Sequence, residues 1–176
     1  TVNNFLKNQI IKTRYVSEHN FEVVYNIPDT KEVSSEESKR INNSLIYIGT
    51  LHSVTGLDVF IENFKCLNNW KETTLFIVGD GPQKKDLKKI CASFSLDKNI
   101  LFKGHIEHQQ AMQLLKSSTL AIIPYINNPL TWVSLPTKLF EYIKLSKTVI
   151  CPNLPGFAEV LGYDNPGLYD KNDRLG

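Results

Sequence analysis

Residues Ser134–Tyr142 are S-L-P-T-K-L-F-E-Y, and K-T-V-I-C-P follows from Lys147. The first stretch predicts an amphipathic helix and the second predicts a buried strand. Pro136 suits the first helical position, because it has no N–H to leave unpaired and its φ is already helical. A helix that leads directly into a buried strand is typical of α/β proteins.

The start of this predicted helix is a candidate anion site. The backbone N–H groups of Thr137 and Lys138 have no partner inside the helix, and the helix dipole favours negative charge there. Lys138 adds a positive charge, and Glu141 follows one turn later, where a carboxylate can accept hydrogen bonds from ribose hydroxyls. The pattern therefore suits a nucleotide. The residues leave open a second interpretation, a capped helix with a Lys–Glu pair on its surface.

The alternation of strand and helix extends in both directions from this stretch. From residue 44 onward, apolar segments alternate with helical segments that carry apolar side chains on one face. The pattern predicts a doubly wound, Rossmann-like parallel sheet with its ligand crevice at the carboxyl ends of the strands. We expect strands at 44–49, 75–79, 100–102, 120–124, 148–151 and 167–169, and helices at 56–67, 83–94, 111–115, 136–145 and 157–161.

The preceding residues are expected to belong to a second domain. Residues 1–20 predict a helix and Phe21–Tyr25 a short strand, whereas residues 29–43 are polar and charged enough for a linker. We therefore assign 1–28 to the end of a preceding domain, 29–43 to the linker and 44–176 to the α/β domain. Because the chain begins at Thr1 and ends in a polar stretch, we expect it to be a piece of a longer protein.

Composition excludes several classes of protein. The 176 residues contain 20 Lys and Arg against 18 Asp and Glu, a balance that gives no electrostatic case for nucleic-acid binding. Cys66, Cys91 and Cys151 fall within apolar patterns, so we expect buried thiols in a reducing compartment. Neither the cysteines nor the four histidines have metal-ligand spacing, so no metal or cofactor is expected.

No apolar run reaches the ~20 residues that cross a bilayer, and no signal peptide is visible. A cytoplasmic location is therefore expected.

Five loops should lie together at the carboxyl edge of the predicted sheet. One of them, G-D-G-P from Gly79, suits either close approach to a ligand or a plain strand-to-helix turn. It lacks the third glycine of a dinucleotide fingerprint, since Lys84 stands there, so NAD binding is disfavoured. Trp132 could stack on a sugar or cover apolar surface. The loops are 49–52, 79–82, 103–106, 124–135 and 152–156.

The ordered set of these motifs resembles a known family. Over about residues 44–170 the chain contains, in order, I-G-T-L-H-S-V-T-G-L-D, L-F-I-V-G-D-G-P, I-L-F-K-G-H-I, L-A-I-I-P-Y and L-P-T-K-L-F-E-Y-I-K-L-S-K-T-V-I-C-P. Together these are similar to the C-terminal, donor-binding domain of the retaining GT-B glycosyltransferases, the glycosyl transferases group 1 family with its glycogen-synthase-like branch. The earlier V-V-Y-N-I-P-D resembles the end of that family's N-terminal domain.

The resemblance implies roles in binding a nucleotide sugar. Glu141 falls where the family holds the ribose hydroxyls, and Thr137 and Lys138 fall where a helix start faces the donor diphosphate. The backbone at 105–106 falls where the nucleobase is recognised, and Gly49 lies where the first loop passes beneath the phosphates. No catalytic residue is assigned. The expected donor-binding set is Ser134, Thr137, Lys138, Glu141, Gly49, Thr50, His105 and Ile106.

Three positions depart from the family pattern. Val133 stands where the family commonly has a first glutamate, and Thr50 and Thr55 stand where an Arg and a Lys often grip the diphosphate. Losing two cations should weaken binding, since a charge-assisted contact contributes roughly 1.5–3 kcal/mol. Lys138, the helix dipole and His52 would have to compensate.

The resemblance implies a retaining transfer of a hexose-type sugar from a UDP- or GDP-linked donor to a hydroxyl acceptor, in polysaccharide or glycoconjugate biosynthesis. This chain would be the donor-binding half, and a sugar or lipid-linked acceptor would meet it through the N-terminal domain. A non-catalytic nucleotide-sugar-binding module and a GT-B sugar-nucleotide epimerase stay open as alternatives. Peripheral association of the full-length enzyme with the inner face of a membrane also stays open. An apolar surface around residues 1–28 would favour a homodimer.

Overall fold

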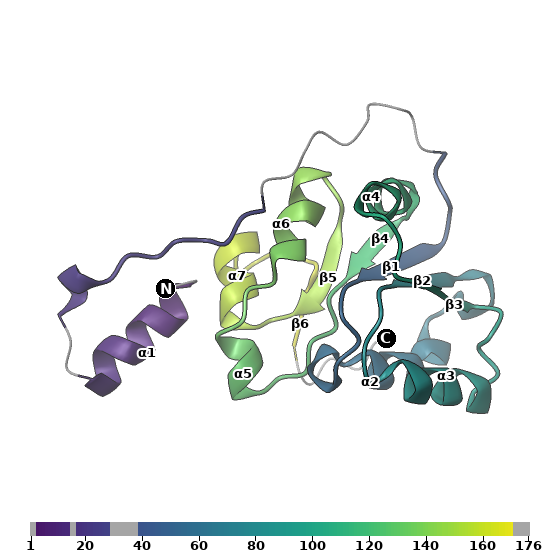
Figure 1. Ribbon diagram of the computed structural model, residues 1–176, viewed down its shortest axis with the longest axis horizontal. Coiled ribbons are helices and arrows are strands. Elements are labelled where there is room, and N and C mark those ends of the chain that lie inside the picture. Colours follow the sequence, from purple (N-terminus) through teal and green to yellow (C-terminus); the bar gives the residue numbers. More distant parts are fainter. Residues whose placement is uncertain (1–2, 15–16, 29–38, 171–176) are drawn as a thin grey trace.

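A computed structural model of the chain describes residues 3–14, 17–28 and 39–170. Six parallel strands form one sheet in the order β3-β2-β1-β4-β5-β6, which confirms the predicted doubly wound arrangement (Figure 1). After β3 the chain crosses to β4, on the other side of β1, and the switch point between the neighbouring strands β1 and β4 opens a crevice at the carboxyl ends of the strands. The strands are β1 (Ser44–Ile48), β2 (Thr74–Val78), β3 (Ile100–Gly104), β4 (Leu120–Ile122), β5 (Val149–Pro152) and β6 (Leu168–Tyr169).

Helices cover both faces of the sheet (Figure 1). Helices α2 and α3 pack on one face, and α4, α6 and α7 pack on the other, so that the domain has two hydrophobic cores. The helices are α1 (Asn4–Arg14), α2 (Leu57–Glu62), α3 (Lys84–Ser93), α4 (His108–Ser117), α5 (Pro129–Trp132), α6 (Thr137–Lys144) and α7 (Pro155–Leu161).

The central strand shows why apolar runs marked the strands in the sequence. Side chains alternate between the two faces along a strand. In β1, Ile46 packs in the core beneath α4 and α6, whereas Leu45 and Tyr47 pack in the core beneath α2 and α3. Because both faces are covered, nearly every position of β1 is buried, and the strand is apolar without the polar alternation of a half-exposed sheet.

The N-terminal segment differs from the prediction. Helix α1 forms as expected and packs against α7, but Phe21–Tyr25 forms no strand. The segment runs beside the helices of the domain and not along a sheet edge: the Tyr25 ring lies 5.9 Å from that of Phe140 in α6, and its hydroxyl donates to Glu159 in α7 at 2.5 Å. With no strand beside it, the segment has no ladder partner. The proposed linker 29–43 lies mostly outside the described residues.

The helices also differ from the prediction: α4 is longer than the expected 111–115, α2 is shorter than expected, and α5 is additional. The helix expected at 56–67 ends at Glu62, where the amide of Asn63 donates to the carbonyls of Val59 and Ile61. A short 3₁₀ helix at Phe64–Cys66 follows; it buries Phe64 and leaves Cys66 exposed, so the expectation of three buried thiols was wrong for Cys66. Helix α5 was not predicted; Asn128, the N-cap before it, and Thr131 within it form a reciprocal cap.

No helix in the described ranges is long and apolar enough to span a membrane.

Candidate functional site

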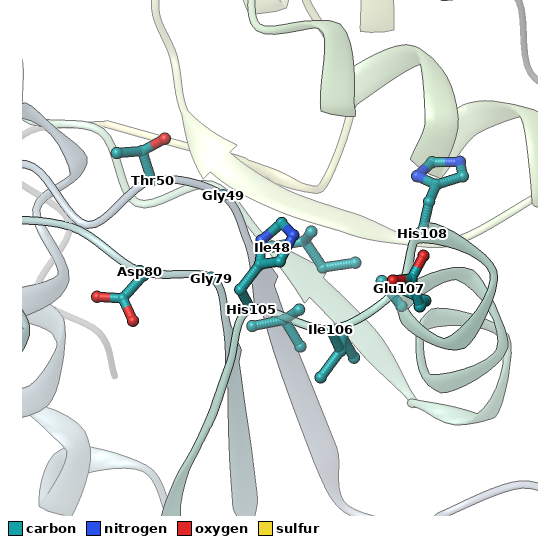
Figure 2. A pocket seen from close by; sticks show the side chains of 11 residues that line it. Ile48, Gly49, Thr50, Gly79, Asp80, His105, Ile106, Glu107 and His108 are labelled. Carbon is teal, nitrogen blue, oxygen red and sulfur yellow. The ribbon is translucent and has the colours of Figure 1, made fainter.

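A pocket of about 500 Å³ opens at the carboxyl ends of β1, β2 and β3, as the fold predicted (Figure 2). Its volume is within the usual range for small-molecule sites. Figure 2 shows Thr50 and Asp80 at one end, Glu107 and His108 at the other, and His105 between them. The lining residues are Ile48, Gly49, Thr50, Val78, Gly79, Asp80, His105, Ile106, Glu107, His108 and Ala111.

Gly79, in the G-D-G-P turn, lets the loop after β2 approach the loop after β1 backbone to backbone. The Gly49 amide donates to the Val78 carbonyl at 2.9 Å, and the Leu51 amide donates to the backbone carbonyl of Asp80 at 3.0 Å. Gly79 has φ +127°, and a Cβ there would lie 2.1 Å from the Gly49 carbonyl oxygen. The second glycine loop therefore supports the first one, which favours the turn interpretation of G-D-G-P.

The start of α6 presents two unpaired backbone amides. Pro136 is the N-cap, with ψ 135°, and not the first helical residue as predicted. Proline has no side-chain oxygen with which to cap a helix, and in the described chain the amides of Thr137 and Lys138 have no hydrogen-bond acceptor. The one-residue shift leaves the predicted anion-binding feature in place, because the same two N–H groups remain free.

The Lys138 amine reaches from α6 to the first loop. A Cβ built on Gly49 would lie 2.5 Å from Nζ, so the amine lies directly over the Gly49 backbone. Nζ is 4.1 Å from the centroid of the Tyr47 ring and 5.6 Å from that of Tyr125. Burial lowers the pKa of Lys138 to about 7, and the nearby Glu141 carboxylate offsets only part of that effect.

Glu141 lies one turn further along α6, at the α4 side of the site. Its side chain is 15% exposed, and Oε1 is 4.0 Å from Nε2 of His108, which lines the pocket. The next residue, Tyr142, is fully buried, and its hydroxyl accepts a hydrogen bond from the Ile48 amide at 3.1 Å. This bond holds α6 against the end of β1, so Lys138 and Glu141 flank the pocket.

The structure thus brings most of the expected donor-binding set together. Gly49, Thr50, His105 and Ile106 line the pocket, and Lys138 and Glu141 contact residues of its wall. The Thr137 side chain is exposed at the start of α6.

Ser134 lies apart from these residues. Its carbonyl faces Gly156 at the start of α7, 3.2 Å from where a Cβ would stand, and Ser134 contributes nothing to the pocket lining.

The positions that depart from the family pattern provide no cation. Thr55 is buried and donates its hydroxyl to the His52 carbonyl at 2.7 Å. His52 itself is exposed and outside the pocket lining. Val133 ends α5, and its carbonyl accepts from the Asn3 side chain at 3.2 Å.

Several residues near the site were not predicted. Asp80, Glu107 and His108 line the pocket, and Tyr47 and Tyr125 surround the Lys138 amine. Asp80 accepts from the Gly81 amide and from Lys84, and these bonds lower the pKa of its carboxyl. A signal existed for Asp80 and Tyr47, since one is within G-D-G-P and the other is two residues before Gly49.

Trp132 and the remaining two loops lie outside the pocket lining. The Trp132 ring packs edge-on against Phe5 of α1 at 6.3 Å, and its Nε1 donates to Asn127 at 2.6 Å. Of the two interpretations of Trp132, covering apolar surface is therefore the one observed. Loops 124–135 and 152–156 contribute no residue to the lining of this pocket. Across the described ranges, His, Cys, Asp and Glu form no group of three that could hold a metal ion.

Comparison with known proteins places this geometry in a family. The family model described as "Glycosyl transferases group 1" matches residues 28–173. An uncharacterized glycosyltransferase of Methanocaldococcus jannaschii is 21% identical over 98% of this chain and 47% of its own length. The chain spans about half the length of the curated relatives it matches.

Solved structures share the fold. The lipopolysaccharide outer core galactosyltransferase WaaB, in its apo form, superposes with a TM-score of 0.75 at 17% identity, over 98% of this chain and 48% of WaaB. A mutant of S. aureus TarM, in complex with Fondaparinux, alpha-GlcNAc-glycerol and UDP, superposes with a TM-score of 0.72 at 14% identity, over 97% of this chain and 33% of TarM. At these identities the likeness establishes the fold alone.

Proposed function

This chain belongs to the glycosyl transferases group 1 family, and we propose that it is the donor-binding half of a glycosyltransferase that uses a UDP- or GDP-linked sugar. The reaction we propose is transfer of a hexose-type sugar to a hydroxyl acceptor with retention at the anomeric carbon. Because the curated relatives are about twice as long as the matched region, we also propose that acceptor binding and turnover need regions beyond this chain.

One observation carries the proposal: the start of α6 leaves two backbone amides free and extends the Lys138 amine to the first glycine loop, which lines a pocket. A donor diphosphate carries negative charge, and this charge increases when the bond between the sugar and the diphosphate breaks. Amides and an amine fixed in advance can stabilise that charge without rearranging. Gly49 has no side chain, so the Lys138 amine can lie over its backbone at the wall of the pocket.

The neighbouring groups suit the rest of a nucleotide. Glu141 is an acceptor for ribose hydroxyls at the α4 side of the pocket. Ile48, Val78 and Ile106 give the pocket an apolar surface for a base, and the backbone at Ile106 offers polar groups to its edge. In support, TarM, which shares the fold, was solved with UDP.

The nucleotide-binding part of the proposal is tested by titrating UDP, GDP, ADP and TDP into the chain in a calorimeter. We expect selective binding of one nucleotide, and at least tenfold weaker binding by Glu141→Ala, because a carboxylate hydrogen bond contributes about 1.5–3 kcal/mol. Glu62→Ala is the matched control, an exposed carboxylate at the end of α2. No binding at millimolar nucleotide, or equal losses in the two variants, would contradict the proposal.

Transfer itself is tested on the full-length enzyme with the nucleotide sugar that the titration selects. The absent Arg and Lys at Thr50 and Thr55 are the observation that favours a binding module without transferase activity. We expect release of the nucleoside diphosphate and a product with the donor's anomeric configuration by NMR. Binding without transfer would instead identify the module, and epimerised free sugar nucleotide would identify an epimerase.

A further inference from the structure

The Lys138 amine lies among aromatic rings and not beside a carboxylate. Nζ is 4.1 Å from the Tyr47 ring centroid and 5.6 Å from that of Tyr125. Within the described part of the chain, no carboxylate comes within 4.0 Å of it and it makes no hydrogen bond. A charged amine in such a site loses hydration, and cation–π attraction and the Glu141 carboxylate offset only part of that loss, so these surroundings disfavour the charged form.

Both rings are held by contacts of their own. Tyr47 is fully buried in β1, and its hydroxyl donates to the Thr50 carbonyl in the first loop at 2.8 Å. The Tyr125 ring packs against Phe157 of α7 at 5.9 Å, and the Tyr125 amide donates to Ile123 at 2.9 Å. The rings therefore set where the amine lies, and through Thr50 the Tyr47 ring is tied to the pocket wall.

We propose that Tyr47 and Tyr125 are positioning residues that hold the Lys138 amine at the first loop with no carboxylate in contact, so that the donor diphosphate becomes its ion-pair partner and diphosphate binding takes up one proton. The proton moves from solvent to the neutral Nζ, and the resulting ammonium pairs with the diphosphate. This inference rests on the proposed function, because it requires a diphosphate at the start of α6.

Other titratable groups near the site must be separated from the amine. Glu141, on the same helix, is the nearest carboxylate, and the pocket wall adds His108, His105 and Asp80. The Lys138 amine, with its pKa of about 7, is mostly neutral at pH 8 and becomes charged when an anion binds. A titration at pH 8 therefore detects proton uptake by the amine.

The probe must not titrate in the same range. The terminal phosphate of a free nucleoside diphosphate has a pKa of about 6 and would contribute its own proton change. In a nucleotide sugar each phosphorus carries one ester bond and the shared anhydride bond, so both phosphates carry a fixed charge near neutrality. UDP-glucose and GDP-mannose are therefore the probes, chosen by the base that the nucleotide titration selects.

The experiment is calorimetric titration of the probe at pH 8 in buffers with different ionisation enthalpies, which reports the protons taken up per molecule bound. We expect uptake of most of one proton, because the amine, with its pKa of about 7, is mostly neutral at pH 8. Lys138→Met should bind at least tenfold more weakly and take up none. Lys98→Met, an exposed lysine before β3 at the opposite edge of the sheet, should retain both affinity and uptake.

A second pair of variants tests the positioning role of Tyr125. Tyr125→Leu opens one side of the amine's surroundings to water, so uptake at pH 8 should fall while the amine can still bind the phosphates. Tyr125→Phe keeps the ring and should retain the uptake. A ring that served only the stability of the fold would change melting temperature and leave the proton count unaltered.

The outcomes separate the inference from the proposed function. Binding whose heat is the same in every buffer would overturn the inference and leave the proposed function intact. Uptake that survives in Lys138→Met but is lost in His108→Asn would also overturn it. If neither nucleotide sugar binds and no nucleotide binds either, the proposed function fails and the inference fails with it.

Discussion

At the residue scale, the site depends on a glycine facing a lysine. Gly49 directly follows β1 and has φ +147°. Its missing side chain leaves the space that the Lys138 amine occupies. The local sequence around either residue does not reveal this contact, because the contact joins the end of β1 to the start of α6. Their contact links the first loop to the free amides of α6, where we propose that the diphosphate binds.

Gly49→Ala should therefore impair binding more than stability. The new Cβ would displace the end of a flexible side chain, and the left-handed backbone adds about 1–3 kcal/mol of strain. We expect at least tenfold weaker nucleotide binding by calorimetry. Gly162→Ala is the control, because Gly162 has φ +91° with nothing within 4 Å of a Cβ, so it carries similar strain away from the site. Equal loss of affinity in both variants would contradict the account.

Lys138 should also make the stability of the empty protein depend on pH. Its folded-state pKa, about 7, is below the unfolded value of about 10.4, so between them the unfolded chain binds more protons and stability rises with pH. We expect Lys138→Met to be more stable than the parent at pH 6. The difference should shrink by about 1–2 kcal/mol between pH 7 and 8.5, because one pH unit corresponds to about 1.4 kcal/mol.

The measurement is urea unfolding of both proteins at several pH values. Other groups titrate too, including the buried thiol of Cys91, whose pKa burial raises to about 11, but their contributions cancel in the difference between the two proteins. Lys98→Met should show a constant difference from the parent across this range. A constant difference for Lys138→Met as well would show that the amine is charged throughout.

At the element scale, α6 is fixed to the sheet by Tyr142. Its buried hydroxyl accepts from the amide of Ile48, the last residue of β1, at 3.1 Å. Tyr142→Phe would leave that N–H without a partner in the core, and we expect the free energy of unfolding to fall by about 1–3 kcal/mol. Tyr163→Phe, on an exposed ring, should change it by less than about 0.5 kcal/mol. Similar values for the two variants would show that the bond does not stabilise the protein.

The sequence predicted those elements whose patterns are local. Apolar runs marked the strands because both faces of the sheet are covered, and P-T-K-L-F-E-Y marked α6 with its unpaired amides. Phe21–Tyr25 has a strand-like composition but lacks a neighbouring strand, which composition does not reveal. The tyrosines around Lys138 come from β1 and from the loop after β4, so their role depends on contacts between distant segments.

At the scale of the whole molecule, the pocket opens at the edge where β1, β2 and β3 end, and α1 packs elsewhere, against α7 (Figure 1). The N-terminal segment leaves apolar side chains exposed, among them Val24 at 65% and Ile27 at 62%. These are the residues through which a homodimer, or another part of a longer chain, could pack. The dimer stays a prediction.

The central claim is that this edge of the sheet binds the nucleotide of a sugar donor, and a site-resolved titration tests it most directly. A chain of 20.1 kDa is suitable for amide NMR, with UDP, GDP, ADP and TDP added in turn. The account predicts that one nucleotide shifts the amide signals of Gly49, Thr50, Ile106, Thr137 and Lys138 and leaves those of Thr74 and Lys98, at the opposite edge, unchanged. Shifts confined to other residues, or no shifts with any of the four nucleotides, would contradict it.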